Sequence, residues 1–379
     1  MIVNFDNAAT TFPKPPEVRL AVEKAAARYG SAGRGGHPIA ARTSDLVYCA
    51  RETAAEFFGA EPENVVFTLN CTHALNLAIQ GLAEGGGHFV ISSLEHNSVL
   101  RPVYALAQKG RIRFSIAKVH AHAQDTVESF RAQLRPDTRA VICTIASNVT
   151  GQILPWKEIG AMCQARGICM VADGAQACGI LPVKLTDGIN ILCTAGHKGL
   201  YGITGTGMLI TDGKFPLLPL MQGGTGSLSS QPEQPDFLPD ALESGTLNVI
   251  GAASVKAGIE FVQKKGIQHL FRMESALCEL LKTRLSAVPE VIVYRSPHAE
   301  YVPILSFSIR GMSSEETAAR LAEQGFCLRA GMHCAPLAHH ALGTQDGAVR
   351  FAPSAFSRMQ DVQRLAEAVR VIASEKSKK

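Results

Sequence analysis

Two residues that can carry amine and carboxylate chemistry follow apolar runs near the middle of the chain. Asp173 ends the run in VADGAQA, and Lys198 follows another in TAGHKGLYG. A lysine amine forms a Schiff base with an aldehyde, and a carboxylate keeps a ring nitrogen protonated so that the ring withdraws electrons. Each residue also has a plainer reading, since Asp caps helices and most lysines are solvated. The elements that carry them decide whether they act as a pair.

From about residue 60 to 210, β-rich runs alternate with amphipathic ones. Strands are predicted over residues 65–68, 89–92, 114–116, 140–143, 170–172, 191–193 and 208–210. Helical spacing of apolar residues predicts helices over 73–82, 126–134 and 156–165. This order predicts an α/β fold with a mostly parallel sheet covered on both faces, whose strand ends place Asp173 and Lys198 in one crevice. A carboxylate and a lysine so placed suit pyridoxal phosphate.

A second region follows a long irregular segment. Residues 223–248 are too rich in Gly, Pro and Ser for a regular element, and such loops in compact enzymes are usually functional. After a predicted helix over 250–265, strands near 291–293 and 304–308 and helices over 314–324 and 362–372 predict a smaller α+β lobe. We expect residues 14–257 to form the large domain, and residues 1–13 with 258–379 the small one.

Composition narrows the class of partner. The 379 residues carry a net charge of +4 with scattered Lys and Arg, which points to neither a nucleic acid nor a membrane partner. The ten Cys show no CxxC pair and read as reduced thiols. The first residues lack a basic segment followed by an apolar run, and no stretch is apolar enough to span a bilayer, so a cytoplasmic address is expected.

The remaining parts of such a site must hold a phosphate and an aromatic ring. Thr72 lies between a predicted strand and a predicted helix, where backbone N–H groups and the helix dipole bind anions. An ordinary N-cap explains the same position. His96 follows the next strand, where a neutral imidazole can stack on a ring and later move a proton, although a structural role is also open.

Nine motifs, in order, resemble the class V aminotransferase superfamily, specifically its branch of cysteine desulfurases and selenocysteine lyases. They span nearly the whole chain: FDNAATT at 5–11, GRGGHPIAART at 33–43, FTLNCTHALN at 67–76, SLEHNS at 93–98, ASNVTG at 146–151, VADGAQ at 171–176, AGHKGLYG at 195–202, ESGTLN at 243–248 and RAGMHCAP at 329–336. The resemblance implies a pyridoxal-phosphate enzyme of fold type I, with a seven-stranded sheet in its large domain.

The resemblance also implies roles at the matching positions. Lys198 would hold the cofactor, Asp173 would pair with its ring nitrogen, and His96 would stack on the ring as acid and base. Further cofactor contacts are implied for Cys71, Thr72, Asn148, Gln176 and His197, and substrate contacts for His37, Asn148 and Arg350. Thr246 matches a threonine that reaches the phosphate of a partner subunit, which implies a homodimer with composite sites.

Cys334 separates the subfamilies, because an aminotransferase needs no thiol there. The resemblance implies that Cys334 attacks the sulfur of L-cysteine, or the selenium of L-selenocysteine, giving alanine and, with cysteine, a persulfide on Cys334. Its short loop from Arg329 resembles type II desulfurases, which often pass sulfur to a separate acceptor protein, for instance for iron–sulfur cluster assembly. His333 would be a second proton carrier beside His96.

Three other hypotheses stay open. His333, Cys334, His339 and His340 have donor atoms for zinc, but Pro336 disturbs the spacing and no second Cys pair exists, so no metal is expected. Another reaction of the same cofactor, or a non-enzymatic sulfur or metal carrier, remains as an alternative.

The chain also departs from the family pattern. Ala195 replaces a usual phosphate-binding Ser, and His73, Ile145, Ile203 and Met332 stand at usual Glu, His, Pro and His positions. These departures suggest a divergent subgroup, and they bear on the substrate more than on the cofactor.

Overall fold

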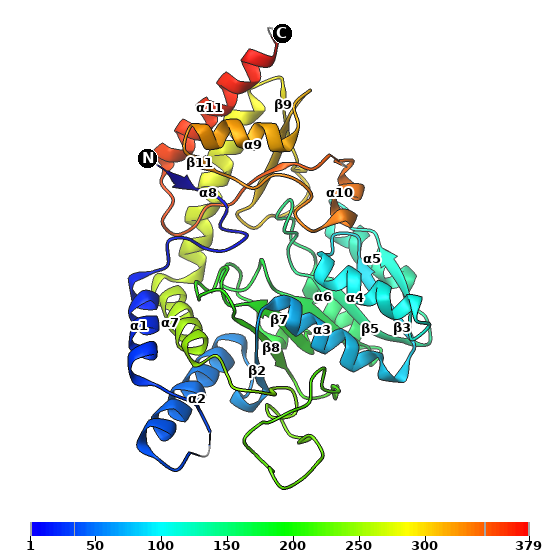
Figure 1. Ribbon diagram of the computed structural model, residues 1–379. Helices are drawn as coiled ribbons and strands as arrows, with labels where there is room; N and C mark the ends of the chain where they lie inside the picture. The colour runs from blue at the N-terminus through cyan, green and yellow to red at the C-terminus, as the bar shows by residue number, and fades with distance from the viewer. Residues whose placement is uncertain (1, 34, 345, 378–379) are drawn as a thin grey trace.

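The computed structural model describes residues 2–33, 35–344 and 346–377, and its centre is a seven-stranded sheet (Figure 1). The strands lie in the order β2-β8-β7-β6-β5-β3-β4, and only β8 runs antiparallel to its neighbours. Their bounds are Val65–Thr68 (β2), His88–Ser92 (β3), Arg113–Ala117 (β4), Thr138–Thr144 (β5), Cys169–Asp173 (β6), Ile191–Ala195 (β7) and Gly207–Thr211 (β8). The predicted α/β fold with a mostly parallel seven-stranded sheet is confirmed.

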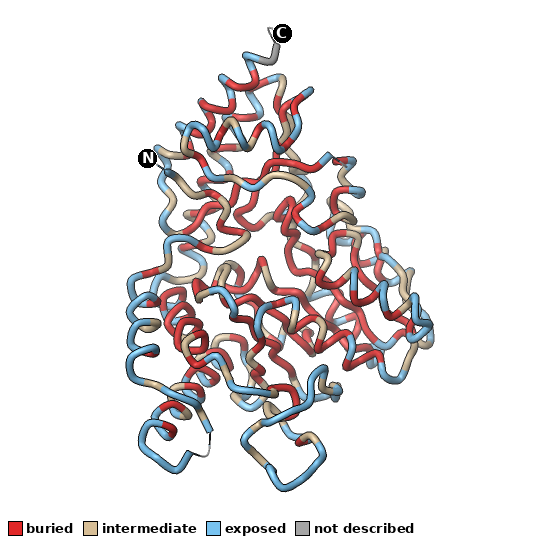
Figure 2. The backbone as a smooth tube through the Cα atoms, viewed as in Figure 1, coloured by how far each residue is buried: buried red, intermediate tan, exposed pale blue. Residues whose placement is uncertain are grey.

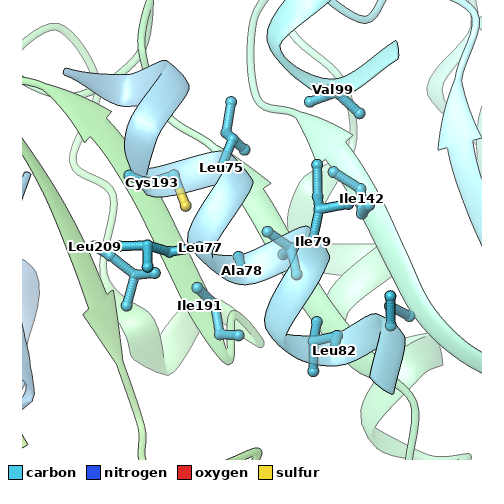
Figure 3. Close-up of a cluster of buried hydrophobic side chains, with 14 of the residues drawn as sticks. Leu75, Leu77, Ala78, Ile79, Leu82, Val99, Ile142, Ile191, Cys193 and Leu209 are labelled. Carbon is cyan, nitrogen blue, oxygen red and sulfur yellow. The ribbon is translucent and has the colours of Figure 1, made fainter. Parts of the chain in front are cut away.

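Helices pack against this sheet and bury its strands, which are apolar because parallel strands covered on both faces exclude water. Figure 3 shows Leu75 and Ile79 of one helix lying against Ile142 and Ile191 of the sheet, and all four side chains are buried. The helices of this region are Pro16–Arg28 (α1), Pro38–Phe58 (α2), Cys71–Leu82 (α3), Asn97–Gln108 (α4), Ala123–Gln133 (α5), Trp156–Gln164 (α6) and Val249–Lys265 (α7). Figure 2 shows the buried backbone concentrated in the sheet and its helices.

The smaller lobe lies at the opposite end of the molecule and combines a three-stranded sheet with helices (Figure 1). The sheet is antiparallel, in the order β12-β10-β9. Its elements are Ile267–Ser286 (α8), Val291–Val293 (β9), Leu305–Ile309 (β10), Ser314–Glu323 (α9), Pro336–Leu342 (α10), Val349–Phe351 (β12) and Met359–Ser377 (α11). The predicted α+β lobe is therefore confirmed. The expected boundary after residue 257 falls inside α7, and the division into domains stays a prediction.

The two ends of the chain both take part in this lobe. Strand β1 (Val3–Asn4) pairs in parallel with β11 (Phe326–Cys327), just before the loop that carries Cys334. The segment between β8 and α7, residues 212–248, contains no helix or strand, which confirms the irregular segment predicted over 223–248. Across the part of the chain that the structure describes, no helix is both long and apolar enough to cross a membrane.

Candidate active site

A cavity opens at the carboxyl ends of β5, β6 and β7, and it encloses about 630 Å³ including space open to solvent. Parallel strands direct the residues that follow them to this edge of the sheet. Eight of the predicted site residues line it together: Cys71, Thr72, His96, Asn148, Asp173, Gln176, His197 and Lys198. Ser98 and Thr144 also line it, although neither residue was predicted to have a role. The predicted pair Asp173 and Lys198 thus shares one cavity.

Asp173 is the last residue of β6 and is buried. Its Oδ1 accepts hydrogen bonds from the backbone N–H of Ala175 at 2.9 Å and from the thiol of Cys71 at 3.4 Å. Burial raises the pKa of Cys71 well above its usual range, and the nearby Asp173 carboxylate raises it further. Cys71 therefore keeps its proton and donates it to the carboxylate, which orients Asp173 within the cavity.

Lys198 stands on a tight loop after β7. The backbone N–H of Tyr201 donates to the Lys198 carbonyl at 2.8 Å, and Tyr201 adopts a positive φ of 56°. Thr11 and Lys14 of the N-terminal segment donate side-chain hydrogen bonds to the His197 carbonyl beside it. Burial lowers the pKa of Lys198, and the attraction of Asp173 only partly opposes this. A lowered pKa favours the neutral amine, which is the form that attacks a carbonyl carbon.

His96 caps the N-terminus of α4 through its ring. The backbone N–H of Ser98 donates to His96 Nδ1 at 3.0 Å. Burial lowers the pKa of His96 to about 4, so the imidazole is neutral near pH 7 and its proton lies on Nε2. Ser98 Oγ lies 2.7 Å from His96 Nδ1 and 2.7 Å from Thr72 Oγ1. The ring-stacking candidate and the phosphate candidate are therefore joined by one hydroxyl group.

The N-terminus of α3 supplies the anion end of the cavity. Asn70 caps this helix by accepting a hydrogen bond from the backbone N–H of His73 at 2.9 Å, so Cys71 and Thr72 form its first turn. His197 Nδ1 is buried without a hydrogen-bond partner among the described residues, and burial lowers the pKa of His197 to about 4. A helix N-terminus, a hydroxyl group and an unpartnered ring nitrogen together fit a phosphate group.

Arg350 reaches this region from β12 of the smaller lobe and is 2% exposed. Its guanidinium donates to the Asn148 carbonyl at 2.8 Å and to Asp6 Oδ1 at 2.9 Å. Its Nε is buried and has no partner among the described residues. Asp6 had no predicted role, although its place in FDNAATT, directly after the first short strand, was the available signal. Asp6 and the Asn148 carbonyl thus hold the two terminal nitrogens of Arg350, while its Nε stays without a partner among the described residues.

The loop that carries Cys334 is docked against the large sheet by backbone contacts. Asn148 Nδ2 donates to the His333 carbonyl at 2.7 Å, and the backbone N–H of Asn97 donates to the Cys334 carbonyl at 2.8 Å. His333 and Cys334 both have positive φ, 49° and 55°, a conformation that non-glycine residues rarely adopt. Cys334 is exposed. The loop thus presents an accessible thiol beside a residue of the cavity.

The hydrogen-bond partners of the His333 ring are protein groups other than the Cys334 thiol. Its Nε2 lies 3.3 Å from the Arg329 carbonyl, and its Nδ1 lies 3.4 Å from His339 Nε2. Both ring nitrogens of His333 therefore face protein groups, whereas His96 and His197 line the cavity itself. Within the described ranges, no three His, Cys, Asp or Glu side chains are arranged to hold a metal ion.

Four predicted residues do not line this cavity: Cys334 and Arg350, which are described above, and Thr246 and His37. Thr246 lines a separate pocket with His73 and Met221. His37 caps α2 by accepting a hydrogen bond from the backbone N–H of Ala40 at 3.3 Å. Their implied contacts with cofactor and substrate stay predictions, and a partner subunit is what the prediction for Thr246 requires.

The fold and the cavity define an α/β enzyme class built on a half-buried lysine and a buried carboxylate. Residues 3–365 match the model of the aminotransferase class-V family, whose members use pyridoxal phosphate, and the chain belongs to this family. The predicted resemblance is therefore confirmed.

The chain is similar over nearly its whole length to proteins described as cysteine desulfurases. It is 32% identical to a probable cysteine desulfurase of Methanothermobacter thermautotrophicus, over 97% of this chain and 94% of that protein. Other relatives are longer, and the chain spans 55–62% of three of them. Among solved structures, a cysteine desulfurase of Thermococcus onnurineus superposes with a TM-score of 0.92 at 26% identity, covering 99% of this chain and 95% of that one. One from Escherichia coli superposes with a TM-score of 0.88 at 26% identity, with the same coverage.

Proposed function

We propose that this protein is a cysteine desulfurase that binds pyridoxal phosphate in the cavity at the ends of β5, β6 and β7. The observation that carries the proposal is the docking of the Cys334 loop onto Asn97 and Asn148, because it brings an exposed thiol to the cavity that contains Lys198 and Asp173. The relatives described as cysteine desulfurases support the same reaction.

The residues present fit the cofactor. Lys198 would hold its aldehyde carbon, Asp173 its ring nitrogen and Thr72 with His197 its phosphate, while Gln176 lines the same cavity. When bound, pyridoxal phosphate supplies an electron-withdrawing ring for the carbon atoms of an amino acid. The hydrogen bond from Cys71 fixes the Asp173 carboxylate before any ligand enters.

L-cysteine is the proposed substrate, and Arg350 is the proposed holder of its carboxylate. Arg350 is already fixed by Asp6 and the Asn148 carbonyl, and its Nε is an unused buried donor. A guanidinium suits a carboxylate because it is planar and always charged, and because its N–H groups can donate two parallel hydrogen bonds. Asn148 also donates a hydrogen bond to the His333 carbonyl. Arg350 and Asn148 would therefore fix the position of the substrate relative to the Cys334 loop.

The reaction then requires transfer of one sulfur atom to Cys334. The thiolate of Cys334 attacks the substrate sulfur, so that a sulfur–sulfur bond forms and the bond from that sulfur to the substrate Cβ breaks. The electron pair of the broken bond stays with the carbon skeleton, which takes up a proton and leaves as L-alanine. Cys334 keeps the second sulfur as a persulfide. We propose the neutral His96 as the group that moves protons in the cavity.

Two further parts of the proposal concern partners. A homodimer would bring Thr246 of one subunit to the phosphate site of the other, since Thr246 lies outside the cavity of its own chain. A separate sulfur-acceptor protein would remove the persulfide, because Cys334 is exposed and its loop is short.

Mass spectrometry of the purified protein tests the function directly. After exposure to L-cysteine with pyridoxal phosphate present, we expect one added sulfur on Cys334, and alanine with sulfide once a reductant is added. Cys334→Ala should reduce alanine formation by at least about a hundredfold, as the loss of a nucleophile does. Cys327→Ala, which removes another exposed thiol, is the matched control and should keep full activity. Unchanged turnover in Cys334→Ala would exclude the persulfide route.

A further inference from the structure

Behind the Cys334 loop, three buried side chains form a line of polar contacts. Thr344 Oγ1 lies 2.9 Å from His339 Nδ1, and His339 Nε2 lies 3.4 Å from His333 Nδ1. At the far end, His333 Nε2 lies 3.3 Å from the carbonyl of Arg329. The exposed fractions are 6% for Thr344, 0% for His339 and 4% for His333, so water does not replace these partners.

The geometry of the two rings is that of a hydrogen bond between their edges. Their planes differ by only 10°, and their centroids are 5.6 Å apart while the facing nitrogens are 3.4 Å apart. The rings of His333 and His339 therefore lie side by side and not face to face. One of the two facing nitrogens must carry a proton for the other to accept it.

The partners at the two ends decide which nitrogen donates. The Thr344 carbonyl lies 3.0 Å from His339 Nδ1, so His339 has a second possible partner there. If neutral His339 donated from Nδ1 to this carbonyl, its Nε2 would accept from His333, and His333 Nε2 would then face the Arg329 carbonyl without a proton. In the opposite direction the Thr344 hydroxyl donates to His339, His339 donates to His333, and His333 donates to the Arg329 carbonyl. Only this second direction gives every ring nitrogen a partner, as buried polar groups require. The Thr344 carbonyl does not need the ring, since the backbone N–H of Gly347 donates to it at 2.9 Å.

This line of hydrogen bonds includes the ring of His333, which belongs to the strained turn of the Cys334 loop. Two successive residues, His333 and Cys334, have a positive φ, a strained conformation that persists only where the surrounding structure holds it. Asn148 and Asn97 hold the two carbonyl groups of this turn from the side of the cavity. The ring of His333 is the corresponding attachment on the other side, and it depends on His339 and Thr344.

We propose that His339 and Thr344 are positioning residues for Cys334, because they fix the direction of the hydrogen-bond line that anchors the His333 side of its turn. The hydroxyl of Thr344 sets the tautomer of both rings, and the proton on His333 Nε2 ties the turn back to Arg329. The role of Cys334 as nucleophile rests on the proposed function, whereas the tautomer and the reactivity of the thiol do not.

Thr344→Val tests the proposal, because it keeps the shape of the side chain and removes only the hydroxyl donor. Thr344→Ser is the matched variant that keeps the hydroxyl. In protein labelled with ¹⁵N-histidine, we expect His333 to be protonated at Nε2 in the wild type and in Thr344→Ser, and at Nδ1 in Thr344→Val. This measurement needs no substrate. Protonation of His333 at Nδ1 in the wild type, or the same tautomer in all three proteins, would overturn the proposal.

Alkylation of Cys334 by iodoacetamide, followed by peptide mass spectrometry, measures the position of the thiol without cysteine present. Loss of one buried hydrogen bond corresponds to about a tenfold effect, so we expect the rate to change about tenfold in Thr344→Val and to return in Thr344→Ser. Persulfide formation with L-cysteine should change in parallel. His340→Ala, in the exposed neighbour of His339, is the control and should match the wild type. Equal alkylation rates in Thr344→Val and Thr344→Ser would contradict the role of the hydroxyl.

Discussion

At the scale of single residues, burial sets the protonation states around the cavity. Burial lowers the pKa values of Lys198, His96 and His197. It therefore favours the neutral amine of Lys198 and the neutral imidazoles of His96 and His197 near pH 7. Lys198 and His96 could be identified from the sequence because each follows a predicted strand within a few residues, whereas His197 was identified through the family resemblance. The sequence motifs could not show that Asn148 and Arg350 contact each other across 202 positions, or that Asp6 completes this contact. Such pairs depend on how the two lobes meet.

Arg350→Lys should weaken substrate binding more than it affects the cofactor. Lysine has no planar fork, so it cannot contact Asp6, the Asn148 carbonyl and a carboxylate at once. A charged hydrogen bond contributes about 1.5–3 kcal/mol, and we therefore expect KM for L-cysteine to rise about 10–100-fold. Steady-state kinetics measure the change in KM. The absorbance spectrum of the bound cofactor, which should not change, is the control. An unchanged KM would show that another residue holds the carboxylate.

Glu274 should make stability depend on pH. It is a buried carboxyl on α8 that accepts a hydrogen bond from the Tyr201 hydroxyl at 3.3 Å, and burial raises its pKa from 4.5 to about 8. The unfolded chain ionises this group near pH 4.5 while the fold keeps it protonated to about pH 8. Its contribution to stability is therefore complete below pH 4.5 and is lost as the pH rises through about 8.

Glu274→Gln is neutral at every pH and should remove this dependence. Each unit of pKa shift corresponds to about 1.4 kcal/mol, so the gain in unfolding free energy of the variant over the wild type should grow by about 2–3 kcal/mol between pH 5.5 and pH 8. Urea unfolding at both pH values measures it. A difference between variant and wild type that does not change with pH would show that Glu274 is ionised in the fold.

At the scale of elements, the strands were predictable and several helices were not. Each of the seven predicted strands of the large sheet lies within the strand that the structure has, because fully buried strands are continuous apolar runs. Helix α4 was not predicted, since Pro102 lies inside it and interrupts the helical signal. Helix α10 has seven residues, too few for a periodic pattern. The joins between elements were also beyond prediction, because they depend on residues far apart in the chain.

One such join is a buried ion pair between α2 and the segment before α7. Arg51 NH1 donates to Glu243 Oε1 at 2.7 Å, and their side chains are 8% and 4% exposed. Glu243 also accepts from the backbone N–H of Phe67, so the pair fixes the segment that leads to Thr246 against β2. Removing one partner leaves a buried charge unpaired, which costs about 3–5 kcal/mol.

We therefore expect Glu243→Leu or Arg51→Met alone to lower the melting temperature sharply. The double variant Arg51→Met with Glu243→Leu should recover most of the loss, because no charge then remains buried. Calorimetry of the four proteins gives the coupling between the two sites. Additive effects of the two single changes would show that the side chains do not act as a pair.

At the scale of the whole molecule, exposed apolar side chains lie at the pocket that contains Thr246. Leu69 and Met221 border the same pocket and are 59% and 48% exposed, and Leu218 nearby in the chain is 51% exposed. Contiguous exposed apolar groups mark surfaces that another protein covers. This agrees with the proposal that Thr246 serves the site of a second copy.

Sedimentation should therefore give a mass near twice the 40.4 kDa of the chain. Met221→Glu places a charge in the proposed contact and should shift the protein towards monomers, since burying an unpaired charge is costly. The fraction of pyridoxal-phosphate sites that are completed by a second subunit should fall as the dimer dissociates. Lys214→Glu, on an exposed lysine in the same segment, is the matched control. A wild-type protein that sediments as a monomer at every concentration would refute the composite site.

The N-terminal segment has a practical consequence for anyone who handles this protein. The side chains of Thr10, Thr11 and Lys14 all donate to the carbonyl group that precedes Lys198. A fusion tag or a proteolytic cut in these first residues would thus act on the lysine loop, although some 187 positions separate them in the chain. Purification handles are better attached beyond α11, which points away from the large sheet (Figure 1).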